Sequence, residues 1–192
     1  MLYKCYAEAE AGKNIEKSLK AIEERYNEII KGLGLKLSLK EQFETIKKNF
    51  EALAGKDYAA SRGEYLNGII MANYLGYEFI DAATVICFDK DGEFDSEKTN
   101  AVCEAKFANI ERAVVPGFYG AMPNGKVKTF SRGGSDVTGS IVARALKADM
   151  YENWTDVSGF LAADPRIVSN AKPINVITYK ELRELSYMGA SV

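Results

Sequence analysis

Apolar residues recur at every third or fourth position through the first third of the chain. This spacing predicts one amphipathic helix over residues 14–33 and another over residues 38–55. Glycines end both segments, and the second begins with the Ser-x-x-Glu spacing of a capping box at Ser38 and Glu41. Two such helices in succession predict an N-terminal helical hairpin.

Beyond residue 60, helical segments alternate with short apolar runs. Helices are predicted over residues 61–76, 96–111, 135–146 and 178–188, and strands over residues 83–88, 113–115, 126–130 and 150–154. Ser61 with Glu64, and Thr178 with Glu181, repeat the capping-box spacing. The alternation predicts an α/β fold. No repeat or linker divides the chain, so we expect one domain over residues 1–192, cut at both ends from something longer.

Composition narrows the class of partner. The chain has 192 residues, 47% of them hydrophobic, and a formal net charge of −2. This leaves no basic excess for nucleic acid or an anionic membrane surface, so we expect a small-molecule partner. No apolar stretch approaches the ~20 residues that span a bilayer, and no signal-peptide pattern opens the chain, which predicts a cytoplasmic protein without membrane contact. Three widely spaced cysteines indicate reduced thiols.

The sequence contains no histidine. Histidine is the usual general base near neutral pH and a common metal ligand. Its absence excludes serine-histidine, cysteine-histidine and histidine-metal chemistry within this chain. Catalysis would have to depend on Asp, Glu, Lys, Arg and backbone amides.

A glycine-rich segment over residues 129–139 lies between a predicted strand and a predicted helix. Gly133 and Gly134 allow close approach of the backbone to a ligand, and the helix N-terminus attracts an oxyanion. Arg132 adds a fork of donors for a carboxylate or phosphate, and Asp136 can orient an ammonium group. The alternative is an ordinary strand-to-helix turn with Ser135 or Asp136 as N-cap.

Residues 154–166 form a second polar segment, after the last predicted strand. Thr155 and Asp156 offer acceptors for a ribose or base, and Arg166 offers a cation for phosphate. The alternative is a turn-rich connection in which Asp164 starts a short helix. Glu64 is ambiguous in the same way, because its spacing from Ser61 also fits a simple helix cap.

Four segments resemble, in order, the aspartokinases of the amino-acid-kinase superfamily. They are SRGE at residues 61–64, FSRGGSD at 130–136, WTDVSGFLAADPR at 154–166 and ITYKELRELSYMGA at 177–190. The third segment is shared with glutamate 5-kinases and, more loosely, with uridylate kinases, so it indicates the superfamily. The pairing of SRGE with RGGSD indicates aspartate as the substrate.

The resemblance implies a three-layer αβα sandwich and an aspartate kinase. Such an enzyme transfers the γ-phosphoryl group of ATP to the side-chain carboxylate of L-aspartate, giving 4-phospho-L-aspartate and ADP, the first step towards lysine, threonine and methionine. It implies an aspartate site of Glu64, Arg132, Gly133, Gly134 and Ser135, catalytic roles for Arg132 and Asp136, and an ATP site of Thr155, Asp156, Leu161, Asp164 and Arg166. Mg²⁺ would bind mainly through nucleotide phosphates without a protein metal site, and the full-length enzyme would be a homodimer.

The chemistry of this reaction fits the lack of histidine. A carboxylate with a pKa of ~4 is already a nucleophile at neutral pH, so it needs no general base. Phosphoryl transfer then depends mainly on alignment and on neutralisation of charge.

The sequence departs from the family in three places. It has no opening strand with a KFGGSS-like loop, whose lysine contacts the transferring phosphate, so we expect very low turnover by this chain alone. Leu161 stands where many members have tyrosine, and Ser191 where many have lysine. Two alternatives stay open: a kinase for another acidic amino acid, and a binding fragment without turnover.

Overall fold

The computed structural model describes residues 1–131, 133–154, 159–164 and 166–187. The chain divides into two compact units, Met1–Tyr151 and Glu152–Val192. The first unit contains the elements from α1 to α6, and the second contains α7 (Tyr179–Tyr187). In the described part of the chain, no helix is long and apolar enough to cross a membrane.

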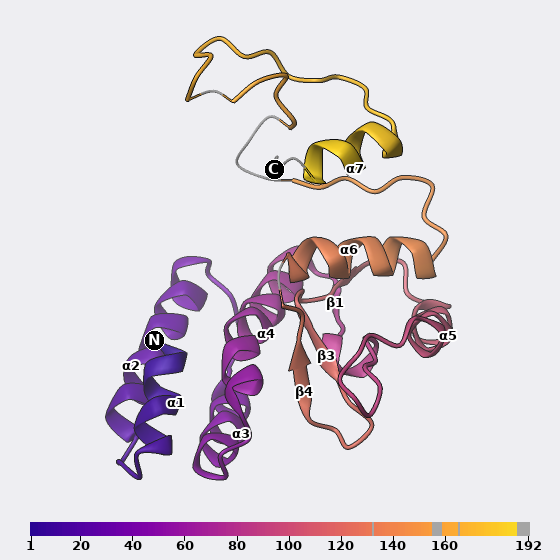
Figure 1. The fold of residues 1–192 in the computed structure, drawn as a ribbon. Helices are drawn as coiled ribbons and strands as arrows, with labels where there is room; N and C mark the ends of the chain where they lie inside the picture. Colours follow the sequence, from indigo (N-terminus) through magenta and orange to yellow (C-terminus); the bar gives the residue numbers. More distant parts are fainter. Residues whose placement is uncertain (132, 155–158, 165, 188–192) are drawn as a thin grey trace. The chain divides into compact units, whose positions relative to one another are not determined.

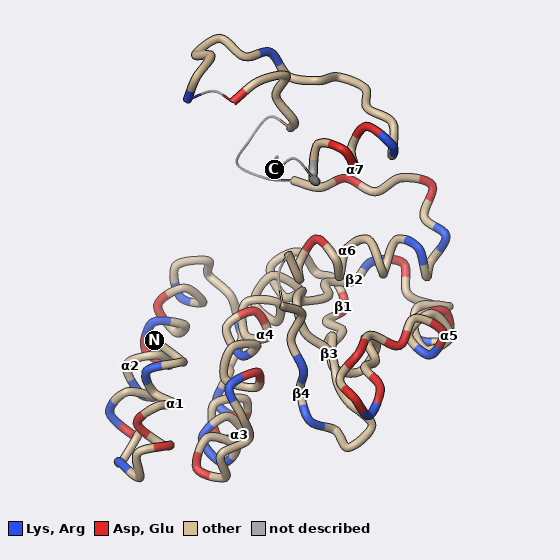
Figure 2. The backbone as a smooth tube through the Cα atoms, in the orientation of Figure 1, with Lys and Arg blue, Asp and Glu red and all other residues tan. Residues whose placement is uncertain are grey.

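Four helices form the N-terminal part of the first unit. They are α1 (Leu2–Glu10), α2 (Glu16–Gly32), α3 (Lys40–Glu51) and α4 (Lys56–Leu75). Helices α1 and α3 pack against α4, and α2 packs against α1 and α3 (Figure 1). Their apolar faces meet in one core, where Phe50 and Leu66 are fully buried. The predicted helical hairpin of α2 and α3 is confirmed. Figure 2 shows residues of both charge signs interspersed along these helices.

Short strands and three further helical elements complete the first unit. The parallel strands β1 (Glu78–Phe79) and β2 (Ala113–Val114) form one sheet, and the antiparallel strands β3 (Tyr119–Ala121) and β4 (Val127–Thr129) form another. The remaining elements are η1 (Ala82–Thr84), α5 (Ser96–Phe107) and α6 (Gly134–Ala145). The strands lie between α4 and α5, and α6 packs against α5 (Figure 1). The predicted α/β fold is confirmed.

Two predicted capping boxes are wrong. Ser61 and Glu64 lie inside α4, which begins at Lys56 after Gly55. The hydroxyl of Ser61 donates to the Tyr58 carbonyl within the same helix, 2.9 Å away, so Ser61 does not cap a helix start. The box at Ser38 and Glu41 does not form either, because Leu39 is the N-cap of α3 and has no side-chain oxygen.

Two predicted strands are also wrong. Residues 83–88 begin in the 3-10 turn η1, because Asp81 accepts the Ala83 N–H at 3.0 Å and starts the turn. Only Cys87 and Phe88 of that run form isolated bridges. Residues 150–154 form no strand, and their side chains are exposed, with Trp154 at 88%. The apolar run at 83–88 is nevertheless buried, since Val85 and Ile86 are inaccessible to solvent.

The second unit contains a short antiparallel pairing and one capped helix. Ala162 N–H donates to the Lys172 carbonyl at 2.9 Å, and Ile174 N–H donates to the Phe160 carbonyl at 2.7 Å. The capping box of α7 is confirmed, because Thr178 N–H donates to Glu181 Oε2 at 2.8 Å. The predicted end of this helix at residue 188 lies outside the described residues.

Candidate functional site

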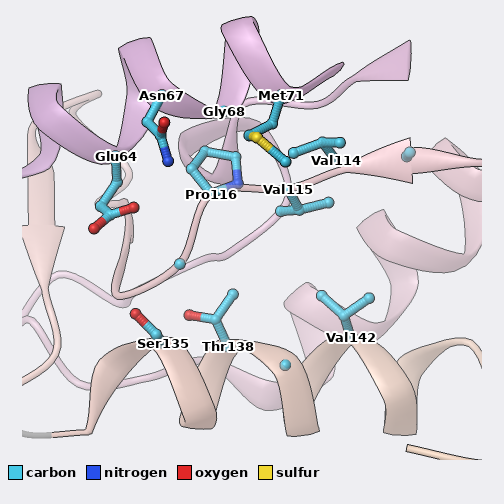
Figure 3. Close-up of a pocket in the computed structure, with 13 residues that line it drawn as sticks. Glu64, Asn67, Gly68, Met71, Val114, Val115, Pro116, Ser135, Thr138 and Val142 are labelled. Carbon is cyan, nitrogen blue, oxygen red and sulfur yellow. The ribbon is translucent and has the colours of Figure 1, made fainter. Parts of the chain in front are cut away.

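A pocket of about 460 Å³ opens between α4, the end of β2 and α6 (Figure 3). It is lined by Glu64, Asn67, Gly68, Met71, Ala113, Val114, Val115, Pro116, Gly117, Ser135, Thr138, Gly139 and Val142. It contains Glu64 and Ser135, two residues predicted from segments about 70 positions apart in the sequence. The fold therefore brings the SRGE and RGGSD segments to one pocket.

Glu64 and Ser135 stand at the polar end of the pocket. The Glu64 carboxylate extends from α4, and the Ser135 hydroxyl from the first turn of α6, and the two point toward one another in Figure 3. Because Glu64 lies in the middle of α4, its carboxylate does not cap that helix. The nearby Tyr26 hydroxyl donates to the Gly63 carbonyl at 3.1 Å, and burial, with a contribution from Glu64, raises the pKa of Tyr26.

The N-terminus of α6 is held by a tight contact with the loop before β3. Gly133 has φ 56°, in the left-handed region, and Gly134 is buried. A Cβ on Gly134 would lie 2.5 Å from Phe118 Cβ. Phe118 N–H donates to Thr138 Oγ1 at 3.0 Å and to the Gly134 carbonyl at 3.2 Å. Glycine at residue 134 is therefore required for this approach.

The other end of the pocket is apolar. Met71 comes from α4, Val115 from the end of β2, and Val142 from α6 (Figure 3). The hydrogen bond from Ile80 N–H to the Val114 carbonyl, 3.0 Å long, shows which edge of β2 faces β1. Since neighbouring residues of a strand direct their backbone groups to opposite edges, those of Ala113 and Val115 point to the edge away from β1.

The sequence did not predict several of the lining residues. Asn67, Gly117 and Thr138 were not assigned a role, nor was Phe118, which supports the α6 N-terminus. The Pro-Gly pair at residues 116–117 could have indicated this part of the pocket. It follows a predicted strand, and α/β sheets bind ligands at the carboxyl ends of their strands.

Three described residues predicted for the acceptor site, Gly133, Gly134 and Asp136, do not line the pocket. Asp136 lies in the first turn of α6, and its side chain is exposed and does not line the cavity. Its backbone carbonyl accepts the Tyr151 hydroxyl at 3.4 Å. Arg132 lies outside the described residues.

The described residues of the predicted ATP segment form a turn in the second unit. Arg166 Nη2 lies 2.7 Å from Asp164 Oδ2, and Arg166 N–H donates to Asp164 Oδ1 at 2.8 Å. These bonds lower the pKa of the Asp164 carboxyl, chiefly through the Arg166 side chain. Leu161 pairs with Pro173 in an isolated bridge. Thr155 and Asp156 lie outside the described residues.

The pocket lies at the N-terminus of a helix in an α/β unit. The chain matches the amino acid kinase family over residues 7–192, and it belongs to that family. It is 41% identical to aspartokinase 3 of Bacillus subtilis over 144 residues, which are 71% of this chain and 32% of that protein.

Solved structures give the same relation. The crystal structure of Clostridium acetobutylicum aspartate kinase is similar with a TM-score of 0.90 and 56% identity, over 99% of this chain and 44% of that one. Escherichia coli aspartokinase III in complex with aspartate and ADP is similar with a TM-score of 0.74 and 27% identity, over 97% of this chain and 47% of that one. The chain thus spans less than half the length of these three relatives.

Proposed function

We propose that this chain is the catalytic part of an aspartate kinase, which transfers the γ-phosphoryl group of ATP to the side-chain carboxylate of L-aspartate. The observation that carries the proposal is the meeting of Glu64 and Ser135 across one pocket. A carboxylate facing a hydroxyl and a helix N-terminus suits a ligand with an ammonium group at one end and a carboxylate at the other. The similarity to an aspartokinase solved with aspartate and ADP supports the same substrates.

In this proposal each acceptor-site residue has one task. Glu64 binds the substrate ammonium group, while Arg132, Ser135 and the amides after Gly133 hold a carboxylate. Asp136 orients the substrate or a catalytic lysine. The reacting side-chain carboxylate of aspartate is ionised at neutral pH, so the protein has only to align it and neutralise charge.

The donor side of the proposal is the segment from Thr155 to Arg166. ATP lies along it, with Asp164 and Arg166 among its contacts, and Mg²⁺ is held mainly by nucleotide phosphates and water, its usual coordination in kinases. Arg166 has to exchange part of its pairing with Asp164 for a phosphate oxygen. Both side chains are at the surface, so this exchange costs little.

The proposal includes the other expectations from the sequence. The two units together form one catalytic domain, the longer enzyme is a homodimer, and the protein is cytoplasmic. Biosynthesis of lysine, threonine and methionine is the pathway it serves.

Isothermal titration of the purified chain with L-aspartate should show binding, and Glu64→Gln should weaken it about tenfold to a hundredfold, as expected when a charge-assisted hydrogen bond is lost (~1.5–3 kcal/mol). Binding of ATP should be unchanged. Glu44→Gln, an exposed glutamate on α3, is the matched control and should bind like the wild type.

The same titration separates the alternatives. Tighter binding of L-glutamate or N-acetyl-L-glutamate than of L-aspartate would identify a kinase for another acidic amino acid. Binding of none of the three, by a chain that still binds ATP, would contradict an acceptor site at Glu64 and Ser135.

A further inference from the structure

Arg62 is a buried cation surrounded by aromatic rings. It is 5% exposed, and its guanidinium carbon lies 4.5 Å from the ring centre of Tyr58, 4.4 Å from that of Tyr65 and 5.4 Å from that of Tyr119. Its Nε and Nη2 donate to Ser61 Oγ at 3.2 and 3.0 Å. None of the ion pairs within the described residues includes Arg62. The ring faces therefore contribute to the stabilisation of this buried charge.

Tyr119 connects this cation to a carboxylate at the start of η1. Its side chain is fully buried, and its hydroxyl donates to Asp81 Oδ1 at 2.7 Å. The same oxygen accepts the Ala83 N–H at 3.0 Å, which orients the carboxylate. Burial, reinforced by Asp81, raises the pKa of Tyr119, so the hydroxyl remains a donor. The Arg62 cluster comprises Tyr58, Ser61, Arg62, Tyr65, Asp81 and Tyr119.

Residues next to the Arg62 cluster in sequence belong to α4, one wall of the pocket, and to the loop that supports α6, the other wall. On α4, Arg62 lies two residues before Glu64. On β3, Tyr119 follows Phe118, whose N–H binds α6 at Gly134 and Thr138. Phe118 has φ 62°, a left-handed conformation that a phenylalanine adopts only under constraint. The stacking of Arg62 on Tyr119 thus joins the turn of α4 that carries Glu64 to the loop that holds the α6 N-terminus.

We propose that Arg62 is a positioning residue, which fixes Glu64 relative to the α6 N-terminus so that both ends of one amino acid can be bound. The inference rests on the proposed function, in which Glu64 and Ser135 hold the substrate. The planar guanidinium stacks between rings and stays in one orientation, whereas a lysine ammonium group would not stack in this way. Arg62 itself does not line the pocket.

The test compares Arg62→Met and Arg62→Lys with a control on the same helix. Asp57→Ala is the control, because Asp57 also ties α4 to a strand, accepting the Thr129 hydroxyl at 3.0 Å and the Thr129 N–H at 3.3 Å. It lies about two helical turns before Glu64 and outside the pocket. The measurements are L-aspartate and ATP affinity by calorimetry, and hydrogen exchange of the Phe118 amide without ligand.

Arg62→Met should weaken L-aspartate binding about tenfold, equivalent to ~1.4 kcal/mol, and leave ATP affinity within about twofold. It should also speed exchange of the Phe118 amide by about tenfold. Arg62→Lys should recover only part of both effects. Asp57→Ala, compared at equal loss of overall stability, should change neither.

The positioning role is wrong if Arg62→Met alters Phe118 exchange and L-aspartate affinity no more than Asp57→Ala does. If the wild-type chain binds no L-aspartate, the proposed function fails, and the ligand-free exchange of Phe118 still decides whether Arg62 fixes the two walls. If Arg62→Met does not fold, Arg62→Lys decides alone, because it keeps the charge but loses the stacking. Exchange of the Phe118 amide no faster than in the wild type would then contradict the positioning role.

Discussion

At the scale of single residues, Asp164 and Arg166 were both expected to bind a nucleotide, and in the structure they form hydrogen bonds with each other. Arg166 bonds both oxygens of Asp164, and its own N–H donates to one of them. The pair closes the turn that contains these residues, and the Asp164 carbonyl also accepts the N–H groups of Ile167 and Val168. Glu64, by contrast, lies in the middle of α4. Its carboxylate does not cap the helix, so it is available to a ligand.

This pairing gives a prediction for the titration of Asp164. Its pKa is lowered, so the stability that the bonds give the turn is present above the ordinary aspartate pKa of ~3.9 and is lost as pH falls through the lowered pKa. NMR titration of the Asp164 carboxyl carbon should give a midpoint below the ordinary value, and Arg166→Met should return it towards that value. Lys180→Met, also in the second unit, should leave the midpoint unchanged. An unaltered midpoint in Arg166→Met would rule out the pairing in solution.

At the scale of elements, three Ser/Thr-x-x-Glu patterns predicted three capping boxes, and the structure contains one. Thr178 and Glu181 cap α7, because that helix begins at Tyr179, directly after the threonine. Ser61 and Glu64 do not, because Ala59, Leu66 and Ile70 continue one buried face of α4 across the pattern. The capping-box pattern covers only four residues. The start of α4 depends instead on the packing of its whole buried face and on Gly55, which has φ 108°.

Short sequence patterns also predicted the strands incompletely. β1 and β3 were not predicted, although β2 and β4, which are equally short, lie within predicted strands. Strands of two and three residues are too short to display an alternating pattern, so their prediction is unreliable. The apolar run at residues 83–88 was predicted as a strand since it is buried, but burial alone does not distinguish a strand from a turn. By contrast, α2, α5 and α6 were predicted to within a few residues, because each is a long segment with a helical period or a clear cap.

The start of α6 provides a stability prediction. Gly134→Ala would place a Cβ 2.5 Å from Phe118 Cβ and 2.8 Å from Phe118 Cα, so the helix start or the loop has to move. We expect a loss of ~1–3 kcal/mol in urea denaturation, as for other overpacked sites. Gly63→Ala, also in a helix, is the control, since its Cβ would lie at an ordinary 3.6 Å from Leu2 Cδ1. This variant should gain up to ~1 kcal/mol of stability from the higher helix propensity of alanine. Equal stability of both variants would contradict the tight contact at Gly134.

At the scale of the whole molecule, the first unit has two hydrophobic cores that share α4. One core gathers α1 to α4, and the other gathers the strands with α5 and α6. Tyr65 packs against both. The sequence predicted the α/β class and the candidate acceptor residues, but not this division, because the packing of one helix between two cores depends on contacts distant in sequence. The Arg62 cluster was missed for the same reason, although Arg62 stands in the SRGE segment.

Buried and half-buried tyrosines of the first unit predict how it responds to alkaline pH. Burial raises the pKa of Tyr26, Tyr58, Tyr65 and Tyr119. Because their folded pKa values are raised, the stability they provide is fully present below the ordinary tyrosine pKa of ~10 and is lost as pH rises above it. In an alkaline titration followed by tyrosinate absorbance, these four tyrosines should ionise above ~10, the ordinary value, together with the loss of helical circular dichroism, and Tyr119→Phe should reduce the amplitude of that step. Ionisation of these four tyrosines near ~10, with the helices intact, would show that their side chains are not packed as described.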